Sequence, residues 1–211
     1  MTTEAAVLAE PPTLRAAHKE LTRSRIRDAA RELFYRQGYN VTTMDQIAVA
    51  AGVRRSTLYF HFKDKDAIVR RIAEEYAPKA KAMQERLAAP RPTREQVGAW
   101  MAELVEFVKA ERAPMVLFRD LAGLSSAPVS DVRKLGDDLI EAMAERLPAF
   151  RAAIEPGEGQ AAARAWAELV MREATRACLY ASRPDAGPEA AVNLAVAGDL
   201  FFRFTEGRLA A

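Results

Sequence analysis

Two arginines, three hydroxyl residues and a histidine lie close together towards the end of the N-terminal third of the chain: Arg54, Arg55, Ser56, Thr57, Tyr59 and His61. If this segment is a helix, Val53 and Leu58 form its buried side and the polar groups fall largely on its other sides. Guanidinium groups hydrogen-bond guanine edges in the major groove, and hydroxyl groups bind phosphate oxygens. These residue types therefore predict a surface that reads double-stranded DNA.

A second helix must precede this segment and hold it in place. Thr43 is followed three residues later by Gln46, a Thr-x-x-Gln capping box that predicts a helix starting at Thr43. We expect Gly52 to end that helix, because glycine adopts the left-handed backbone that a sharp exit requires. The small side chain of Ala48 lets the next helix cross closely over the first. The two elements together predict a helix-turn-helix.

Residues 42–66 resemble the DNA-binding signature of the TetR-like family of transcriptional regulators, and residues 25–38 resemble the first helix of that family. The matching positions are Thr43, Ile47, Ala48, Ala51, Gly52, Val53, Thr57, Leu58, Tyr59, His61, Phe62 and Lys65. Two positions depart from the signature. Arg54 stands where the family most often has a capping serine, and Ser56 stands where it often has glycine. Because the loss of a cap typically costs ~1 kcal/mol and Arg54 adds a cation, family operator preferences do not transfer.

The predicted DNA-binding residues are Thr43, Arg54, Arg55, Ser56, Thr57, Tyr59, His61 and Lys65. The alternative is that these residues belong to two packed helices of an all-helical protein with no DNA partner. The capping box, the turn glycine and the aromatic and basic second helix favour the helix-turn-helix.

Charge is distributed unevenly along the 211 residues, although the net charge is only +2. Residues 15–71 hold 13 Lys or Arg against 6 Asp or Glu, and residues from 72 onward hold 18 against 21. A basic N-terminal part is typical of a DNA reader, since phosphate neutralisation supplies much of the affinity. A solvated basic face is the alternative interpretation of this asymmetry.

We expect an all-α fold of about nine helices. An N-terminal three-helix domain is joined by a linking helix to a C-terminal helical domain for ligand binding and dimerisation. The expected domains are a flexible arm (1–19), the helix-turn-helix domain (20–66) and the C-terminal domain (67–211). Helices are expected from about Thr22, Thr43, Arg54, Asp64 (towards Ala88), Thr93, Pro114 and Val129, then over 159–182 and 188–208.

Two features of these elements allow more than one interpretation. Arg15 and Lys19 in the arm could reach a neighbouring groove, or the arm could be an ordinary tail. Pro78 lies inside the fourth helical pattern and predicts a kink near Glu74. That kink could act as a hinge between the two domains, or it could simply bend a helix around the core.

The C-terminal part offers candidate residues for an effector pocket and for a dimer interface. Aromatic, Met and other apolar residues at helical spacing predict a pocket for an unknown small molecule of apolar or aromatic character: Trp100, Met101, Leu104, Phe107, Phe118, Leu121, Met143, Trp166 and Cys178. Small residues allow close helix packing, and the resemblance implies a four-helix homodimer interface, which we assign to Ala177, Leu194, Ala195, Gly198, Phe201 and Phe202.

Several classes of function are disfavoured by the sequence. The two histidines lie outside the C-terminal part, so no catalytic residue, metal site or cofactor is predicted. No secretory signal or membrane-spanning stretch is visible, and Cys178 is the single cysteine, which predicts a cytoplasmic protein without an internal disulfide. Cys178 is expected to be a small apolar helix residue, with a thiol sensor as the alternative.

The sequence therefore predicts a cytoplasmic, homodimeric transcriptional regulator, a repressor that binds a palindromic operator and is released by a small molecule. A constitutive DNA-binding or architectural protein without a ligand remains one alternative. A helical enzyme that relies on carboxylates, arginine or tyrosine remains a second.

Overall fold

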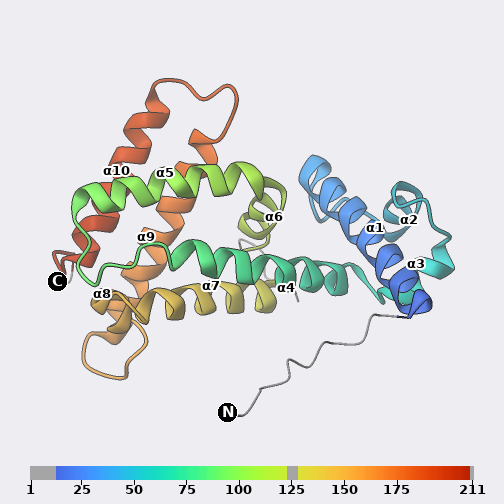
Figure 1. Ribbon diagram of the computed structural model, residues 1–211, viewed down its shortest axis with the longest axis horizontal. Coiled ribbons are helices and arrows are strands. Elements are labelled where there is room, and N and C mark those ends of the chain that lie inside the picture. Colours follow the sequence, from blue (N-terminus) through green and yellow to red (C-terminus); the bar gives the residue numbers. More distant parts are fainter. Residues whose placement is uncertain (1–12, 123–127, 210–211) are drawn as a thin grey trace, which may run out of the picture. The chain divides into compact units, whose positions relative to one another are not determined.

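The computed structural model describes residues 13–122 and 128–209, and these residues form ten helices (Figure 1). The all-helical fold class predicted from the sequence is confirmed. The helix beyond the nine expected has only four residues, Pro148–Arg151, and it begins at Pro148 because the fixed φ of proline suits a first turn. The chain divides into an N-terminal unit, Met1–Ile68, and a C-terminal unit, Val69–Ala211.

The boundary between the two units falls within α4. The N-terminal unit contains α1 (Leu14–Gln37), α2 (Met44–Ala50), α3 (Arg55–His61) and the start of α4 (Lys65–Gln84). The C-terminal unit contains the rest of α4 and then α5 (Arg94–Ala110), α6 (Arg112–Ala122), α7 (Pro128–Ala144), α8 (Pro148–Arg151), α9 (Gln160–Ala181) and α10 (Glu189–Thr205).

The first helix begins earlier than the sequence analysis expects. It starts at Leu14 instead of about Thr22, because the Thr13 hydroxyl accepts a hydrogen bond from the Ala16 amide at 3.3 Å and caps the helix there. Residues 13–19 of the predicted flexible arm are therefore a helix and its cap. The remainder of that arm, residues 1–12, lies outside the described residues.

The helix-turn-helix is held together by its caps and by a small apolar core. The predicted capping box is confirmed: the Gln46 amide donates to the Thr43 hydroxyl, and the Thr43 amide donates to the Gln46 side chain at 2.9 Å. Gly52 has a φ of +63°, the left-handed backbone predicted for the turn. A side chain there would also collide with Arg25, whose guanidinium donates to the Ala51 carbonyl at 2.8 Å.

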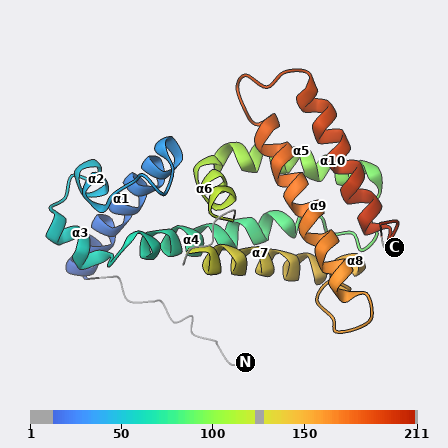
Figure 2. The ribbon, with the colours of Figure 1, turned by 180° about the vertical axis from the view of Figure 1, so that it is seen from behind.

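The C-terminal unit packs α5, α9 and α10 against one another, as Figure 2 shows. Its centre contains four aromatic side chains. The Phe201 ring lies 4.8 Å from Trp100 and 5.7 Å from Phe150, and Phe150 meets Phe204 edge to face at 5.0 Å, all between ring centroids. Such contacts add to the stabilisation that burial of these rings provides.

Two helix boundaries in the C-terminal unit differ from the expectation. Helix α4 ends at Gln84, before Ala88, and α6 begins at Arg112, which places Pro114 in its first turn, where proline is tolerated. The residues expected to close α6, Gly123 and Ser125-Ser126, lie outside the described residues. The start of α5 is as predicted, since Thr93 and Gln96 form the second capping box.

Helix α4 continues through Pro78, whose side chain is exposed. Figures 1 and 2 show its C-terminal part beside α7, where the Lys81 ammonium lies 3.4 Å from the Glu145 carboxylate. Whether Pro78 acts as a hinge stays a prediction. Across the part of the chain described, every helix is too short or too polar to cross a membrane.

Candidate nucleic-acid interface

Helix α3 has one fully buried side chain and an exposed face. Leu58 is fully buried in the N-terminal unit, whereas Arg55, Ser56 and Tyr59 are exposed. Thr57 and His61 are half-buried at the sides of the helix. A seven-residue helix with a buried leucine and exposed donors has the size and chemistry of an element that enters the major groove.

Arg55 is oriented by two neighbours before any partner binds. Its guanidinium lies 3.1 Å from the Asp45 carboxylate, and both side chains are well exposed. The same guanidinium lies 5.6 Å from the centroid of the Tyr59 ring. An exposed ion pair of this kind contributes little stability, so Arg55 can exchange Asp45 for a guanine edge or a phosphate at low cost.

Thr43 is the N-cap of α2 and Arg54 is the N-cap of α3, but only the Thr43 side chain makes a capping hydrogen bond. Arg54 is the N-cap of α3 and its side chain makes no capping hydrogen bond, as the departure from the family signature predicts. Its guanidinium is exposed. The Thr43 hydroxyl accepts the Gln46 amide at 3.2 Å and itself donates to the Gln46 side-chain oxygen at 3.3 Å, so both of its hydrogen-bonding roles serve the cap.

Lys65 is held by main-chain carbonyl groups. Its ammonium donates to the carbonyls of Tyr39 and Thr42 at 2.8 and 2.7 Å, and the Asn40 carbonyl lies at 3.4 Å. Burial lowers the pKa of Lys65, with Asp66 opposing that effect. Three acceptors match the three donors of an ammonium group, so this geometry favours a role in fixing the loop before α2 over the predicted phosphate contact.

A second link at the same place was not predicted from the sequence. The Tyr39 hydroxyl donates to the Asp66 carboxylate, and the Tyr39 ring also lies 4.4 Å from the Lys65 ammonium. Burial and the hydrogen bond to Asp66 raise the pKa of Tyr39. We call Tyr39, Lys65 and Asp66 the α4 clasp, because they join the start of α4 to the loop between α1 and α2.

His61 is half-buried beside cations from α1. Burial, followed by the charges of Lys19 and Arg23, lowers the pKa of its imidazole, and Glu20 partly opposes this. Among the described residues no group hydrogen-bonds its buried Nδ1. A neutral imidazole is therefore the favoured form, and His61 can contact DNA as a hydrogen-bonding group more readily than as a cation.

The helical start of α1 adds cations to the recognition helix. The Lys19 ammonium lies 5.8 Å from the centroid of Phe60, and the Arg23 guanidinium lies 5.3 Å from that of Phe62. Lys19 was expected in a flexible arm, but α1 fixes it beside α3. The Lys19 ammonium, on α1, therefore lies beside the Phe60 ring of α3.

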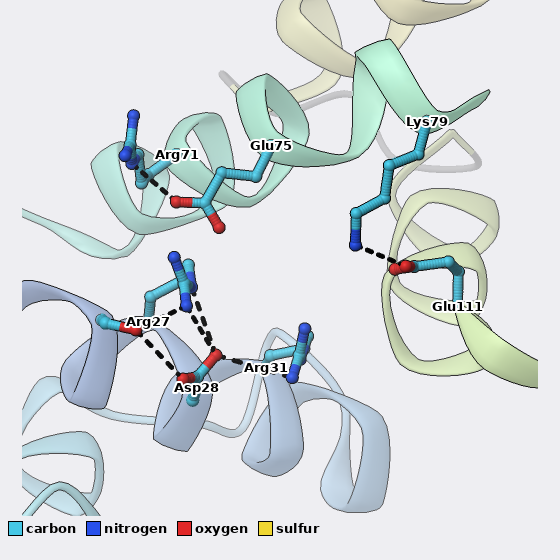
Figure 3. Close-up of polar contacts among 8 residues, drawn as sticks. Arg27, Asp28, Arg31, Arg71, Glu75, Lys79 and Glu111 are labelled. Atoms are coloured by element: carbon cyan, nitrogen blue, oxygen red, sulfur yellow. Dashed lines mark hydrogen bonds and ion pairs between the residues drawn. The ribbon is translucent and has the colours of Figure 1, made fainter. Parts of the chain in front are cut away.

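Other cations of the N-terminal unit are paired with acids of their own helix. Figure 3 shows Asp28 between Arg27 and Arg31, at 3.0 and 3.5 Å. The same figure shows two pairs of the C-terminal unit, Arg71 with Glu75 at 2.9 Å and Lys79 with Glu111 at 2.5 Å. These pairs reduce the positive charge available to a phosphate backbone, and Arg54, Arg55 and Lys19 are exposed cations on or beside α3.

Residues 26–72 match the family model of bacterial regulatory proteins, tetR family. Over this segment the chain is similar to the tetR family. Over 57 residues it is 47% identical to the HTH-type transcriptional regulator SrpR of Pseudomonas putida, a match that covers 27% of each chain. The match to this relative and to the next curated regulator thus spans about a quarter of their length.

Solved structures resemble this chain over almost its whole length. Salmonella enterica GusR has a TM-score of 0.64 at 20% identity and covers 98% of this chain and 100% of its own. FadR of Bacillus subtilis, solved in complex with stearoyl-CoA, has a TM-score of 0.61 at 16% identity, covering 87% and 98%. At these identities the similarity establishes the fold.

The predicted pocket residues of this chain are mostly packed into its core. Trp100, Met101, Leu104, Phe118, Leu121, Met143 and Cys178 are buried, and Phe107 and Trp166 are half-buried. Two of them flank Tyr76: the centroid of the Tyr76 ring lies 5.9 Å from that of Phe107 and 5.3 Å from that of Phe118. A surface groove of 260 Å³ between the end of α4 and α5 has Trp100 on its wall, together with Arg86, Leu87, Ala88, Ala89, Gln96, Ala99 and Glu103.

Cys178 behaves as the apolar interpretation expects. It is fully buried, with its sulfur 3.9 Å from the Met101 carbonyl. Burial raises the pKa of its thiol to about 12. Since oxidation requires an accessible thiolate, this environment disfavours a thiol sensor.

The predicted dimer residues fall into two groups. Ala177 and Phe201 are buried within the subunit, so their side chains cannot form an outer face. Leu194, Gly198 and Phe202 are half-buried and Ala195 is exposed. Sequence reasoning missed Val192 and Val196, both 63% exposed and one helical turn apart on α10. Their spacing in a helix with surplus apolar residues was the available signal.

Proposed function

We propose that this chain is a ligand-responsive transcriptional repressor that binds a palindromic operator as a homodimer in the cytoplasm. The observation that carries the proposal is helix α3, which exposes Arg55, Ser56 and Tyr59 while Leu58 is fully buried. The helix lies in the basic part of the chain, within the segment that matches the tetR family.

A homodimer would place one copy of α3 in each half-site. Successive major grooves on one side of B-DNA lie about 34 to 36 Å apart, so operator affinity depends on the separation of the two recognition helices. A small molecule that binds better to a dimer with a different separation would shift the population away from the DNA-binding form. We place that effector among α5, α6, α7 and α9, the helices that carry the predicted pocket residues.

The character of the pocket residues suggests an apolar or aromatic effector. FadR of Bacillus subtilis, which shares this fold, was solved with stearoyl-CoA, a long apolar chain on a polar carrier. Acyl-CoA thioesters are therefore the first compounds to test here. Because seven of the nine predicted pocket residues are buried in the core, a constitutive DNA-binding protein without a ligand is the second candidate.

The first experiment selects DNA from the source genome with the purified chain and measures affinity for the recovered operator. We expect specific binding that weakens steeply with salt, by ~0.9 logarithmic units per phosphate neutralised. An Arg55→Ala, Tyr59→Phe double variant should bind at least about tenfold more weakly, since each base or phosphate contact typically contributes ~1–3 kcal/mol. Unchanged operator affinity in the folded variant would contradict the assignment of α3 as the helix that contacts the DNA bases.

The second experiment separates the two candidates. The chain is titrated with stearoyl-CoA and with a panel of apolar and aromatic compounds, and both its melting temperature and its operator affinity are measured. A compound that raises the melting temperature and releases the DNA supports the ligand-responsive repressor. DNA binding that no compound changes supports the constitutive protein.

A further inference from the structure

Phe60 is a large apolar side chain in the middle of the exposed face of α3. It is 74% exposed, between Tyr59 and His61 in the chain, and its ring meets the edge of His61 at 5.3 Å. Ser56, one helical turn earlier, is exposed on the same side. The two residues lie almost opposite the buried Leu58, so Phe60 points away from the core of the N-terminal unit.

The surroundings of Phe60 favour a polyanion over an apolar protein surface. The Lys19 ammonium lies 5.8 Å from the centroid of its ring, and the exposed Arg55 belongs to the same short helix. Covering this face with an apolar partner would strip water from the Lys19 ammonium and from the Arg55–Asp45 ion pair without adding a charged partner, which is costly. A nucleic acid instead supplies phosphates for the cations and flat bases for the ring.

We propose that Phe60 reads a thymine by packing against its C5-methyl group, once in each half-site. The inference rests on the proposed function and deepens it. A phenyl ring has no donor or acceptor, so Phe60 cannot take part in the hydrogen-bond code of the major groove. The thymine methyl is the apolar group that base pairs present there, and it is the natural partner of an apolar side chain. Lys19 then lies where it can neutralise a phosphate beside the same base.

The test is a methyl scan of the operator recovered by genomic selection. Each thymine is replaced in turn by deoxyuridine, which keeps every hydrogen-bonding group and removes only the methyl. Affinities are measured by fluorescence anisotropy for the wild type, Phe60→Ala and a matched control, Leu21→Ala. Leu21 is an apolar residue of α1 that is 61% exposed, so its truncation removes exposed apolar area from α1 and leaves α3 unchanged.

We expect one thymine per half-site whose replacement weakens wild-type and Leu21→Ala binding about fourfold, the loss expected for one buried methyl group. In Phe60→Ala the same replacement should have no effect. Because Phe60 is exposed, the variant should fold normally, which circular dichroism checks. The inference is overturned if the wild type senses no methyl group, or if Phe60→Ala senses the same one. Failure to recover any specific operator would instead overturn the proposed function itself.

Discussion

Basic side chains in the N-terminal unit serve two different purposes. Lys65 and Arg25 donate to main-chain carbonyls at the loop before α2 and at the turn after it. Arg54 and Arg55 are exposed on α3 and its cap. The charge of residues 15–71 therefore overstates the number of phosphate contacts, because part of it holds the recognition helix in position.

The α4 clasp can be tested by removing its ammonium group. Lys65→Met should lower the free energy of unfolding by ~1–3 kcal/mol, because half-buried carbonyls lose their donor. Lys63→Met is the matched control: Lys63 is exposed and 3.6 Å from Asp64, so we expect a change within ~0.5 kcal/mol. Urea unfolding measures both. Equal stability of the two variants, with operator affinity lost only in Lys65→Met, would instead support the DNA contact that the sequence predicts for Lys65.

His61 makes stability depend on pH in a predictable direction. Its pKa is lowered in the folded chain, chiefly by burial and then by Lys19 and Arg23. The unfolded chain therefore binds the proton more readily, and the contribution is present above the ordinary histidine value of about 6.5 and lost as pH falls below it. We expect His61→Gln to lose less stability than the wild type between pH 7.5 and pH 5.

Urea titrations of both proteins at the two pH values isolate the contribution of His61, since all other titrating groups are shared. An identical pH dependence in the two proteins would mean that protonation of His61 carries no energetic cost in the folded state.

At the scale of elements, helix starts were predictable where the capping residues are local in sequence. Thr43 with Gln46 and Thr93 with Gln96 were recognised because both partners of each cap lie within four residues. The start of α1 was missed because Thr13 has no such partner and follows two prolines. The α4 clasp had no sequence signal at all, since Tyr39 and Asp66 are 27 residues apart and meet only in the folded chain.

The missing cap of α3 leads to a prediction for that element. Arg54→Ser should restore a capping hydroxyl and raise the free energy of unfolding by ~1 kcal/mol. Arg54→Ala removes the same charge without adding a cap, so it should leave stability nearly unchanged. Both variants should weaken DNA binding to a similar degree, because each loses one cation beside the backbone. Thermal melts and operator titrations of the pair distinguish capping from charge; equal melting temperatures would contradict the capping argument.

At the scale of the whole molecule, the sequence predicted a basic DNA-binding part and a separate C-terminal part. It did not predict which side chains are exposed. The basic part ends at residue 71, within a few residues of the unit boundary at Ile68. Composition, however, cannot tell a residue buried within one subunit from one that a second subunit would cover. Phe201 and Val196 illustrate this: both are apolar residues of α10, yet the first is fully buried and the second is 63% exposed.

A homodimer formed through α10 is therefore best tested at Val196. Gly198 is a poorer choice for a charged substitution, because a Cβ there would already lie 3.7 Å from Met101, so a long side chain would disturb the subunit core as well. Val196→Arg places a charge on the exposed stripe that contains Val192 and Ala195. If a second subunit covers this stripe, the unpaired charge must be desolvated and the dimer should dissociate.

Light scattering of the wild type, Val196→Arg and the control Ala102→Arg, an exposed alanine on α5, measures the oligomeric state. We expect a dimeric wild type and control and a folded, monomeric Val196→Arg. Since a monomer engages only one half-site, Val196→Arg should also lose most operator affinity while its N-terminal unit remains folded. A monomeric wild type that binds its operator tightly, or a Val196→Arg variant that stays dimeric, would place the interface elsewhere on the molecule or remove it from the mechanism.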